Sequence, residues 1–314
     1  MDVRLSPEQR ALRDAAAQVV DRLGPQAVGA LDDTERAAKL AAAVAGAGWL
    51  ELRTAMPSVP APEVGVGTPT SGAGTHGEGR PWASGVEVGI VAEELGRGLA
   101  DAAYLGPTLA AELRRLAGAP AGAGPEAIAL VPDLSDLAAA AGPAGDVLAG
   151  AAVAVDARGT AAALVLAPGD GGYALGEVET PDDRGDSDGD GGDGIDLTRT
   201  TAVVPAGTPV RRVPDQARPL TAGDLTRWTA LGLALTCADL VGTMRGAVRQ
   251  AVDYAGDRRQ YGRAIGSFQA VQHLLADAHV ATEGSRSAAL HAAWAADALP
   301  PGEALAAASV AKAY

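Results

Sequence analysis

The sequence predicts an α+β protein in which two helical blocks flank a small β domain. Apolar residues recur at helical spacing in the first part of the chain and again in the last part, whereas short apolar runs broken by Gly, Pro and Asp fill the middle. We therefore expect three domains, at residues 1–120, 121–217 and 218–314. A chain of 314 residues that is 47% hydrophobic is long enough to bury a large core.

The first helix has a clear start signal. Ser6 stands at the N-cap, Pro7 at the first helical position and Gln9 three residues after the cap, and the apolar pattern ends at Gly24-Pro25. The same spacing predicts further helices at about 32–47, 86–99 and 108–117, the last of which ends at Gly118. The first block is thus expected to be a helical domain.

The middle of the chain changes to the rhythm of strands and turns. Short apolar runs at 127–131, 147–155, 162–166, 172–178 and 200–204 are separated by turn-forming residues. This pattern predicts a small antiparallel β domain.

Two segments between these elements lack periodicity. Residues 56–84 are rich in Pro and Gly and predict a long surface loop, in which His76 has no metal-binding partner at a suitable spacing. Residues 186–196 begin like a calcium-binding loop, but position twelve is Leu197 instead of the required Glu. An acidic, Gly-rich hairpin loop is the favoured interpretation.

Helical spacing returns after Thr221, which with Asp224 forms a second cap signal. A long helix is expected to about residue 257, followed by a turn over 261–266 and a second long helix from Ser267, as its N-cap, to about 297. Pro300-Pro301-Gly302 breaks the pattern, and a third helix from Glu303 is still in mid-pattern at Tyr314, so the bundle is expected to be truncated.

Charge and composition narrow the function. A net charge of −14 argues against a nucleic-acid partner, and the single Cys237 excludes an intrachain disulfide. The polar start is not a signal peptide, and the Ala-rich stretches are interrupted before the ~20 residues that a membrane span needs. We expect a cytoplasmic protein with no membrane contact.

The remaining reactive residue types have structural interpretations. His273, His279 and His291 do not share a helix face, so no metal site is expected. Cys237 lies in an apolar helix and predicts a buried, unreactive thiol. Trp228 and Trp294 are expected in the core or at a subunit contact.

The residues that could bind a charged ligand are concentrated at the turn between the two long helices. Arg258, Arg259 and Arg263 surround a Gly-containing turn that opens into a helix N-terminus, where backbone N–H groups and the helix dipole favour an anion. From Arg245 to Gln269 the chain has five Arg and two Asp. On charge alone, a solvated helix hairpin with ordinary surface arginines is the favoured interpretation of this island.

The order of residues at this turn resembles the C-terminal helical domain of the acyl-CoA dehydrogenase family. The family signature is Arg-x-x-(Phe/Tyr)-Gly with Gln seven residues after the Gly, here Arg258, Tyr261, Gly262 and Gln269. Three further segments are similar in the same order: Glu93–Arg97, Asp196–Arg199 and Ala311–Tyr314.

The resemblance implies a flavoenzyme with an N-terminal helical domain, a middle antiparallel β-barrel and a C-terminal helical bundle. FAD would lie between barrel and bundle, with Arg258 on its pyrophosphate and Gln269 at its adenine-nucleotide end. Tyr261 and Phe268 would supply apolar contacts, and Gln260 belongs to the same cofactor-binding motif. Because these residues usually serve a neighbouring subunit, the resemblance also implies an oligomer.

The implied reaction, in lipid metabolism, is the α,β-dehydrogenation of an acyl-CoA to a trans-2-enoyl-CoA, with an electron-transfer flavoprotein as the usual acceptor. It needs a carboxylate base. In members with the base on the earlier long helix, that position corresponds to Gly232 here, and neither Asp224 nor Asp239 matches it. No catalytic residue is therefore assigned.

Three accounts of the missing base remain open. In the first, a C-terminal segment beyond Tyr314 supplies the base. In the second, the chain is a degenerate subunit of an α2β2 enzyme, and its partner subunit supplies the base. In the third, the chain is a non-catalytic binding or scaffold protein on this fold. The intact Arg258–Gln269 turn favours the first two, and the second, with a partner subunit, is preferred.

Overall fold

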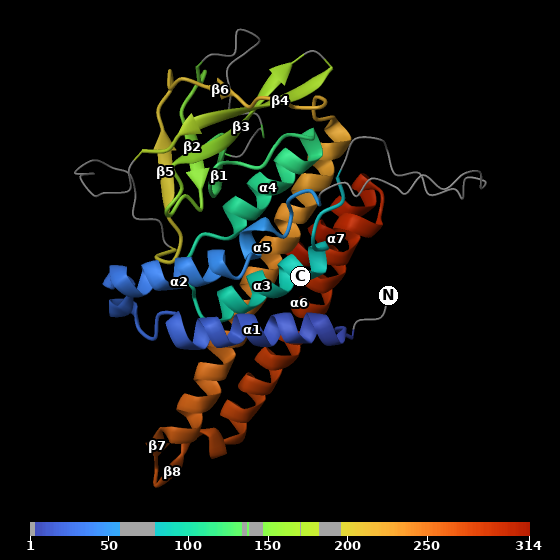
Figure 1. The fold of residues 1–314 in the computed structure, drawn as a ribbon. Helices are drawn as coiled ribbons and strands as arrows, with labels where there is room; N and C mark the ends of the chain where they lie inside the picture. Colours follow the sequence, from blue (N-terminus) through green and yellow to red (C-terminus); the bar gives the residue numbers. More distant parts are fainter. Residues whose placement is uncertain (1–3, 57–78, 134–136, 138–146, 170, 182–195) are drawn as a thin grey trace.

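The computed structural model describes residues 4–56, 79–133, 137, 147–169, 171–181 and 196–314. A sheet stands at one end of the molecule, the N-terminal helices pack beneath it, and the long C-terminal helices run past both (Figure 1). The predicted loop around His76 and the predicted acidic loop at 186–195 lie outside the described residues. The flanks of the first are joined by a β-bridge between Ala55 and Pro81.

The N-terminal block is helical, as predicted. It comprises α1 (Pro7–Leu23), η1 (Val28–Asp32), α2 (Thr34–Gly46), η2 (Trp49–Glu51), α3 (Gly85–Arg97) and α4 (Leu105–Ala117). The capping box at Ser6 is confirmed, since the side chains of Ser6 and Gln9 each bond the other residue's backbone N–H. Gly118 ends α4 in the left-handed conformation, with φ of 62°.

The middle block is a six-stranded sheet in the order β5-β2-β1-β3-β4-β6. Its strands are β1 (Glu126–Leu130), β2 (Ala152–Val155), β3 (Ala162–Gly169), β4 (Gly172–Glu179), β5 (Thr201–Val204) and β6 (Arg211–Arg212). The prediction of a purely antiparallel sheet is wrong for one pair, because β1 and β3 run parallel. No pairing joins β5 to β6 among the described strands, so a closed barrel is not seen.

Strand lengths also differ from the prediction. The run at 147–155 forms a strand only from Ala152, and Val147 makes an isolated bridge to Pro209 instead. The two-residue strand β6 was not predicted, because Arg211 and Arg212 carry no apolar alternation and pair only at the sheet edge.

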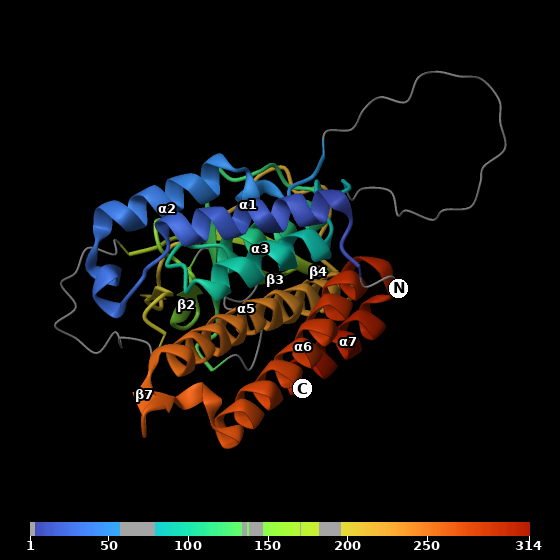
Figure 2. The same cartoon turned by 90° about the horizontal axis from the view of Figure 1, so that it is seen from below.

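The C-terminal block consists of three helices. α5 (Ala222–Asp257) and α6 (Gln269–Ala298) are joined by β7 (Arg259–Gln260), β8 (Arg263–Ala264) and η3 (Ile265–Ser267), and α7 (Pro301–Ala313) follows. The cap at Thr221 and Asp224 is confirmed. Figure 1 shows α5 and α6 continuing past α1 to β7 and β8, and Figure 2 shows α6 and α7 on the side of α5 away from α1 and α2.

Helices α3 and α5 cross with their backbones in contact. A Cβ added at Gly242 would lie 1.9 Å from the carbonyl oxygen of Glu93, and one at Gly96 would lie 2.2 Å from that of Asp239. Only glycine permits this approach. The crossing anchors the main hydrophobic core, which continues from the N-terminal helices into the sheet and α5, with Trp228 buried in it.

Helix α5 is long and apolar enough to cross a membrane by length and composition, although 39% of its most apolar window is buried inside the molecule. The core helix of a water-soluble protein has the same composition. Here the N-terminal half of α5 supplies Leu225, Trp228, Leu231 and Leu235 to the core. The packing of this half explains its apolar sequence.

Candidate functional site

The predicted cofactor residues lie at the far end of α5 and α6 (Figure 1). The chain leaves α5 at Arg258 and reverses through a two-residue hairpin turn, with φ of 51° at Tyr261 and 77° at Gly262. Two consecutive positive φ values match the twist of a tight hairpin. The register pairs Arg259 with Ala264 and Gln260 with Arg263.

The turn is fixed against the last residues of α5. The N–H of Ile265 donates to the carbonyl of Arg258 at 2.8 Å. Gly266 lies so close to Ala255 that an added Cβ would be 2.9 Å from its carbonyl oxygen. The position of the turn relative to the helix is therefore set by backbone contacts.

The predicted N-cap of the second long helix is wrong. Phe268, not Ser267, is the N-cap of α6, and it makes no side-chain capping bond. Ser267 belongs to η3 and donates to the carbonyl of Ala264 at 2.7 Å. The first-turn N–H groups of α6 therefore have no side-chain cap, which leaves the positive end of the helix dipole open to an anion.

The structure brings two of the five predicted residues into contact. The rings of Tyr261 and Phe268 meet edge to face, with centroids 6.3 Å apart. Arg263, which was not among the five, places its guanidinium 4.2 Å from the Phe268 ring centroid. The signal for Arg263 in the sequence is its place in the predicted turn over 261–266, two residues after Tyr261.

The other predicted residues point outward. Arg258, Gln260 and Gln269 are exposed, and none makes a side-chain hydrogen bond within the part of the chain that the structure describes. Tyr261 is 93% exposed. We call the residues of this turn the tip: Arg258, Arg259, Gln260, Tyr261, Arg263, Phe268 and Gln269. The role of the tip in cofactor binding stays a prediction.

The donor set of the tip suits a dinucleotide such as FAD. Three guanidinium groups and the open N–H groups of α6 are donors of the kind that hold a pyrophosphate. The amides of Gln260 and Gln269 suit the polar edge of a base, and the Tyr261 and Phe268 rings suit a flat ring system. The residues present thus fit the cofactor.

The two aspartates nearest the family's base position have other partners. Asp224 caps α5 and accepts a 2.6 Å bond from Arg218; burial opposes its ionisation, but these hydrogen bonds lower its pKa overall. Asp239 is ion-paired with Arg199 at 2.6 Å, and burial raises its pKa against the pull of that arginine. Asp239 thus links α5 to Arg199, in the chain beside the sheet.

Gly232 is half-buried on α5 and faces α4. A Cβ added there would lie 3.5 Å from a methyl group of Leu109, in ordinary van der Waals contact. Close by, the Trp228 indole N–H donates to the carbonyl of Leu109 at 2.9 Å. No carboxylate stands at this position of the helix.

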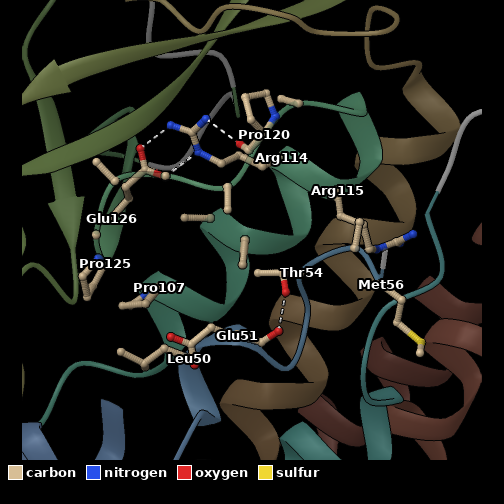
Figure 3. A pocket seen from close by; sticks show the side chains of 18 residues that line it. Leu50, Glu51, Thr54, Met56, Pro107, Arg114, Arg115, Pro120, Pro125 and Glu126 are labelled. Atoms are coloured by element: carbon tan, nitrogen blue, oxygen red, sulfur yellow. Dashed lines mark hydrogen bonds and ion pairs between the residues drawn. The ribbon is translucent and has the colours of Figure 1, made fainter. Parts of the chain in front are cut away.

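A cavity of about 560 Å³ lies between η2, α4 and the loop that leads into β1 (Figure 3). Arg114 at its wall is held by Glu126, through bonds of 2.5 and 2.6 Å, and by the carbonyl of Pro120. Arg115 bonds Glu112 instead. Both arginines are thus paired internally, and no tip residue lines this cavity.

The single cysteine is buried at 5% exposure among α5, α6 and α7, and burial raises its pKa, as expected for an unreactive thiol. His273, His279 and His291 are exposed, and His291 stacks on Trp294 with ring centroids 5.6 Å apart. Within the described residues no group of three or more metal-ligating side chains occurs.

Comparison with known sequences gives a consistent result. Residues 230–314 match the family model "Acyl-CoA dehydrogenase, C-terminal domain". Acyl-CoA dehydrogenase IpdE2 of Mycolicibacterium smegmatis is 37% identical over 93 residues, 30% of this chain and 27% of that protein. Benzylmalonyl-CoA dehydrogenase of Aromatoleum aromaticum is 39% identical over 75 residues, 24% of this chain and 20% of that protein. The matched segments thus span a quarter or so of these relatives.

Comparison with solved structures covers nearly the whole chain. The ChsE4-ChsE5 complex from Mycobacterium tuberculosis superposes with a TM-score of 0.69 at 23% identity, over 100% of this chain and 84% of that one. The Tcur3481-Tcur3483 steroid acyl-CoA dehydrogenase G363A variant gives 0.68 at 24% identity, over 97% and 82%. Glutaryl-CoA dehydrogenase from Mycobacterium smegmatis gives 0.63 at 22% identity, over 99% and 81%.

These structures share the fold of the whole chain, and the C-terminal helices carry the sequence pattern of the family. Residues 230–314 thus resemble the C-terminal domain of the acyl-CoA dehydrogenases, and the whole chain shares the fold of these solved structures.

Proposed function

We propose that this chain is an FAD-dependent acyl-CoA dehydrogenase subunit that acts in an oligomer with a partner subunit. The reaction would be the α,β-dehydrogenation of an acyl-CoA to a trans-2-enoyl-CoA in the cytoplasm. The observation that carries the proposal is the tip, whose polar side chains are exposed to solvent. Such residues complete a site only when another subunit covers them.

Each tip residue has a defined task in this proposal. Arg258 pairs with the pyrophosphate of FAD, and Gln269 and Gln260 bond its adenine-nucleotide end. Tyr261 and Phe268 pack against the flat part of the cofactor, and Arg263 holds the Phe268 ring in place. FAD, when bound, accepts the hydride from the β-carbon of the substrate.

The base is assigned to the partner subunit. Gly232 offers no carboxylate, Asp224 is a helix cap, and Asp239 is bound to Arg199. Two of the similar solved structures, ChsE4-ChsE5 and Tcur3481-Tcur3483, are each named for two proteins, which favours an α2β2 assembly of unlike subunits. An electron-transfer flavoprotein would reoxidise the flavin.

The test is the visible flavin absorbance of the purified protein, prepared alone and co-expressed with an acyl-CoA dehydrogenase encoded beside it. We expect flavin on co-expression and its loss in Arg258→Ala. Arg249→Ala is the matched control, because Arg249 is an exposed arginine on the same helix, 72% accessible and outside the tip.

Flavin bound by the chain alone would instead indicate a self-sufficient homo-oligomer. No flavin in either preparation would overturn the enzyme proposal and leave the non-catalytic scaffold. Flavin that survives Arg258→Ala unchanged would overturn the role of the tip.

A further inference from the structure

A second hollow, of about 390 Å³, lies where the segment before α3 meets the ends of α5 and α6. Its walls come from residues far apart in sequence: Arg80, Pro81, Trp82, Arg115, Arg227 and Asp297. Arg227 stands near the start of α5 and Arg258 just after its end, so the hollow is about 46 Å along that helix from the tip, at 1.5 Å per residue. It is a separate feature of the molecule.

Two acids around the hollow, Asp297 and Glu112, are already neutralised by arginines. Asp297 accepts two bonds from Arg53, at 2.9 and 3.1 Å, and a third from the N–H of Gly85 at 2.5 Å. Glu112 is held by Arg53 and Arg115. With Arg80 and Arg227, the cluster has four arginines and two acids.

The arginines exceed these two acids by two charges, and Glu87, which bonds the wall residue Ser84, offsets one of them. No carboxylate pairs with Arg80 or Arg227 within the described residues, whereas almost every other arginine near the core has one. Arg227 bonds the carbonyl of Ala296 at the end of α6 through Nη1, at 3.0 Å, and its other N–H groups make no bond there. A local excess of positive charge stands out in a chain of net charge −14.

An aromatic ring borders the same hollow. Trp82 is 56% exposed, in a chain whose aromatic residues are only 3% of the total. An exposed indole beside unpaired guanidinium groups combines a stacking surface with phosphate donors. A volume of about 390 Å³ is within the size of small-ligand sites.

We propose that this hollow binds a nucleoside phosphate, with the phosphate on Arg227 and Arg80 and the base stacked on Trp82. The phosphate forms charge-assisted bonds with the guanidinium of Arg80 and with the N–H groups of Arg227 that do not bond Ala296. The ring adds binding that is tolerant of the base, because every base offers a flat face. Binding must weaken with salt, since the arginines are accessible to solvent.

The experiment uses the purified full chain without flavin and measures the binding of AMP, inorganic phosphate and adenosine by calorimetry and tryptophan fluorescence. We expect AMP to bind, and phosphate or adenosine alone to bind about tenfold more weakly or not at all. Arg80→Gln and Arg227→Gln should each weaken AMP binding about tenfold. Trp82→Phe should remove the fluorescence change.

Arg249→Gln is the control for general loss of positive charge and should leave AMP binding unchanged. Arg80→Gln carries the test if Arg227→Gln unfolds, because Arg80 is exposed and supports no helix. Equal binding of AMP and phosphate, or equal binding by Arg80→Gln and the control, would overturn the proposal.

AMP could instead bind at the tip. In that case Arg258→Ala would abolish binding while Arg80→Gln would not, and the proposal for the hollow would be wrong. Because the measurement needs neither flavin nor a partner subunit, its outcome is independent of the proposed dehydrogenase activity.

Discussion

The guanidinium of Arg53 holds the carboxylate of Glu112 through two hydrogen bonds, of 2.9 and 3.0 Å, in the interior of the protein. Both side chains are 1% exposed. Arg53 also binds Asp297, which is 244 residues away at the end of α6. One arginine thus connects the N-terminal helices to the C-terminal bundle.

Glu112→Ala should lower the free energy of unfolding by about 3–5 kcal/mol, because it leaves buried positive charge unpaired. Equilibrium urea unfolding measures this change. Glu35→Ala, which removes an exposed acid from a helix-surface pair, should change stability by less than about 1 kcal/mol. Similar losses in the two variants would show that the buried pair has no special role.

The contribution of Glu112 to the stability of the protein should also depend on pH. Burial alone would raise the pKa of Glu112, but the charges and hydrogen bonds of Arg53 and Arg115 outweigh it and lower the pKa from 4.5 to about 2. The unfolded chain therefore takes up this proton at higher pH than the folded chain. The stabilisation is complete above about pH 4.5 and is lost as the pH falls toward about 2.

The difference in unfolding free energy between the native protein and Glu112→Gln should accordingly shrink as the pH falls through that window. Urea unfolding at a series of acidic pH values measures it. A difference that stays constant with pH would show that folding does not lower the pKa of Glu112.

Much of the fold follows from local signals in the sequence. The capping boxes at Ser6 and Thr221 and the stop at Gly118 are local interactions, and the structure has all three. The cap of α4 is different. Its first N–H groups bond Asp156, about fifty residues later and beside the sheet, at 2.8 and 3.1 Å. No local pattern predicts a cap supplied from another domain.

The site was predictable only in part. The spacing from Arg258 to Gln269 located the tip, but not which residue caps α6 or that Arg263 covers Phe268, since both depend on the path of the hairpin. The parallel pairing of β1 with β3 likewise depends on strand order in space. The hollow beside Trp82 joins residues from three parts of the chain, which sequence spacing cannot bring together.

Tyr261→Ala should separate folding from cofactor binding. The Tyr261 side chain is 93% exposed, so its loss should change the stability of the chain by less than about 0.5 kcal/mol. If the tip packs against FAD in another subunit, the flavin content of the co-expressed complex should fall severalfold. Thermal unfolding and flavin absorbance measure the two effects, and undiminished flavin would contradict the assigned contact.

Cys237 should be protected from thiol reagents in the folded protein. Its side chain is buried among α5, α6 and α7, and burial raises its pKa, so little thiolate is present or accessible. Reaction with an aromatic disulfide should be about a hundredfold slower in native protein than in urea, because it requires local opening. Equal rates would indicate an accessible thiol.

The crossing of α3 and α5 offers a test with an internal control on one helix. At Gly242 an added Cβ would lie 1.9 Å from the carbonyl oxygen of Glu93, and this backbone atom cannot move without displacing α3. Gly242→Ala should therefore lower the free energy of unfolding by about 1–3 kcal/mol or more.

Gly256, on the same helix, has no atom within 4 Å of an added Cβ. Gly256→Ala should raise stability by about 0.5–1 kcal/mol, because alanine loses less backbone entropy on helix formation. Urea unfolding of both variants gives the signs directly, and a stabilising effect at Gly242 would mean that the two helices do not cross in contact there.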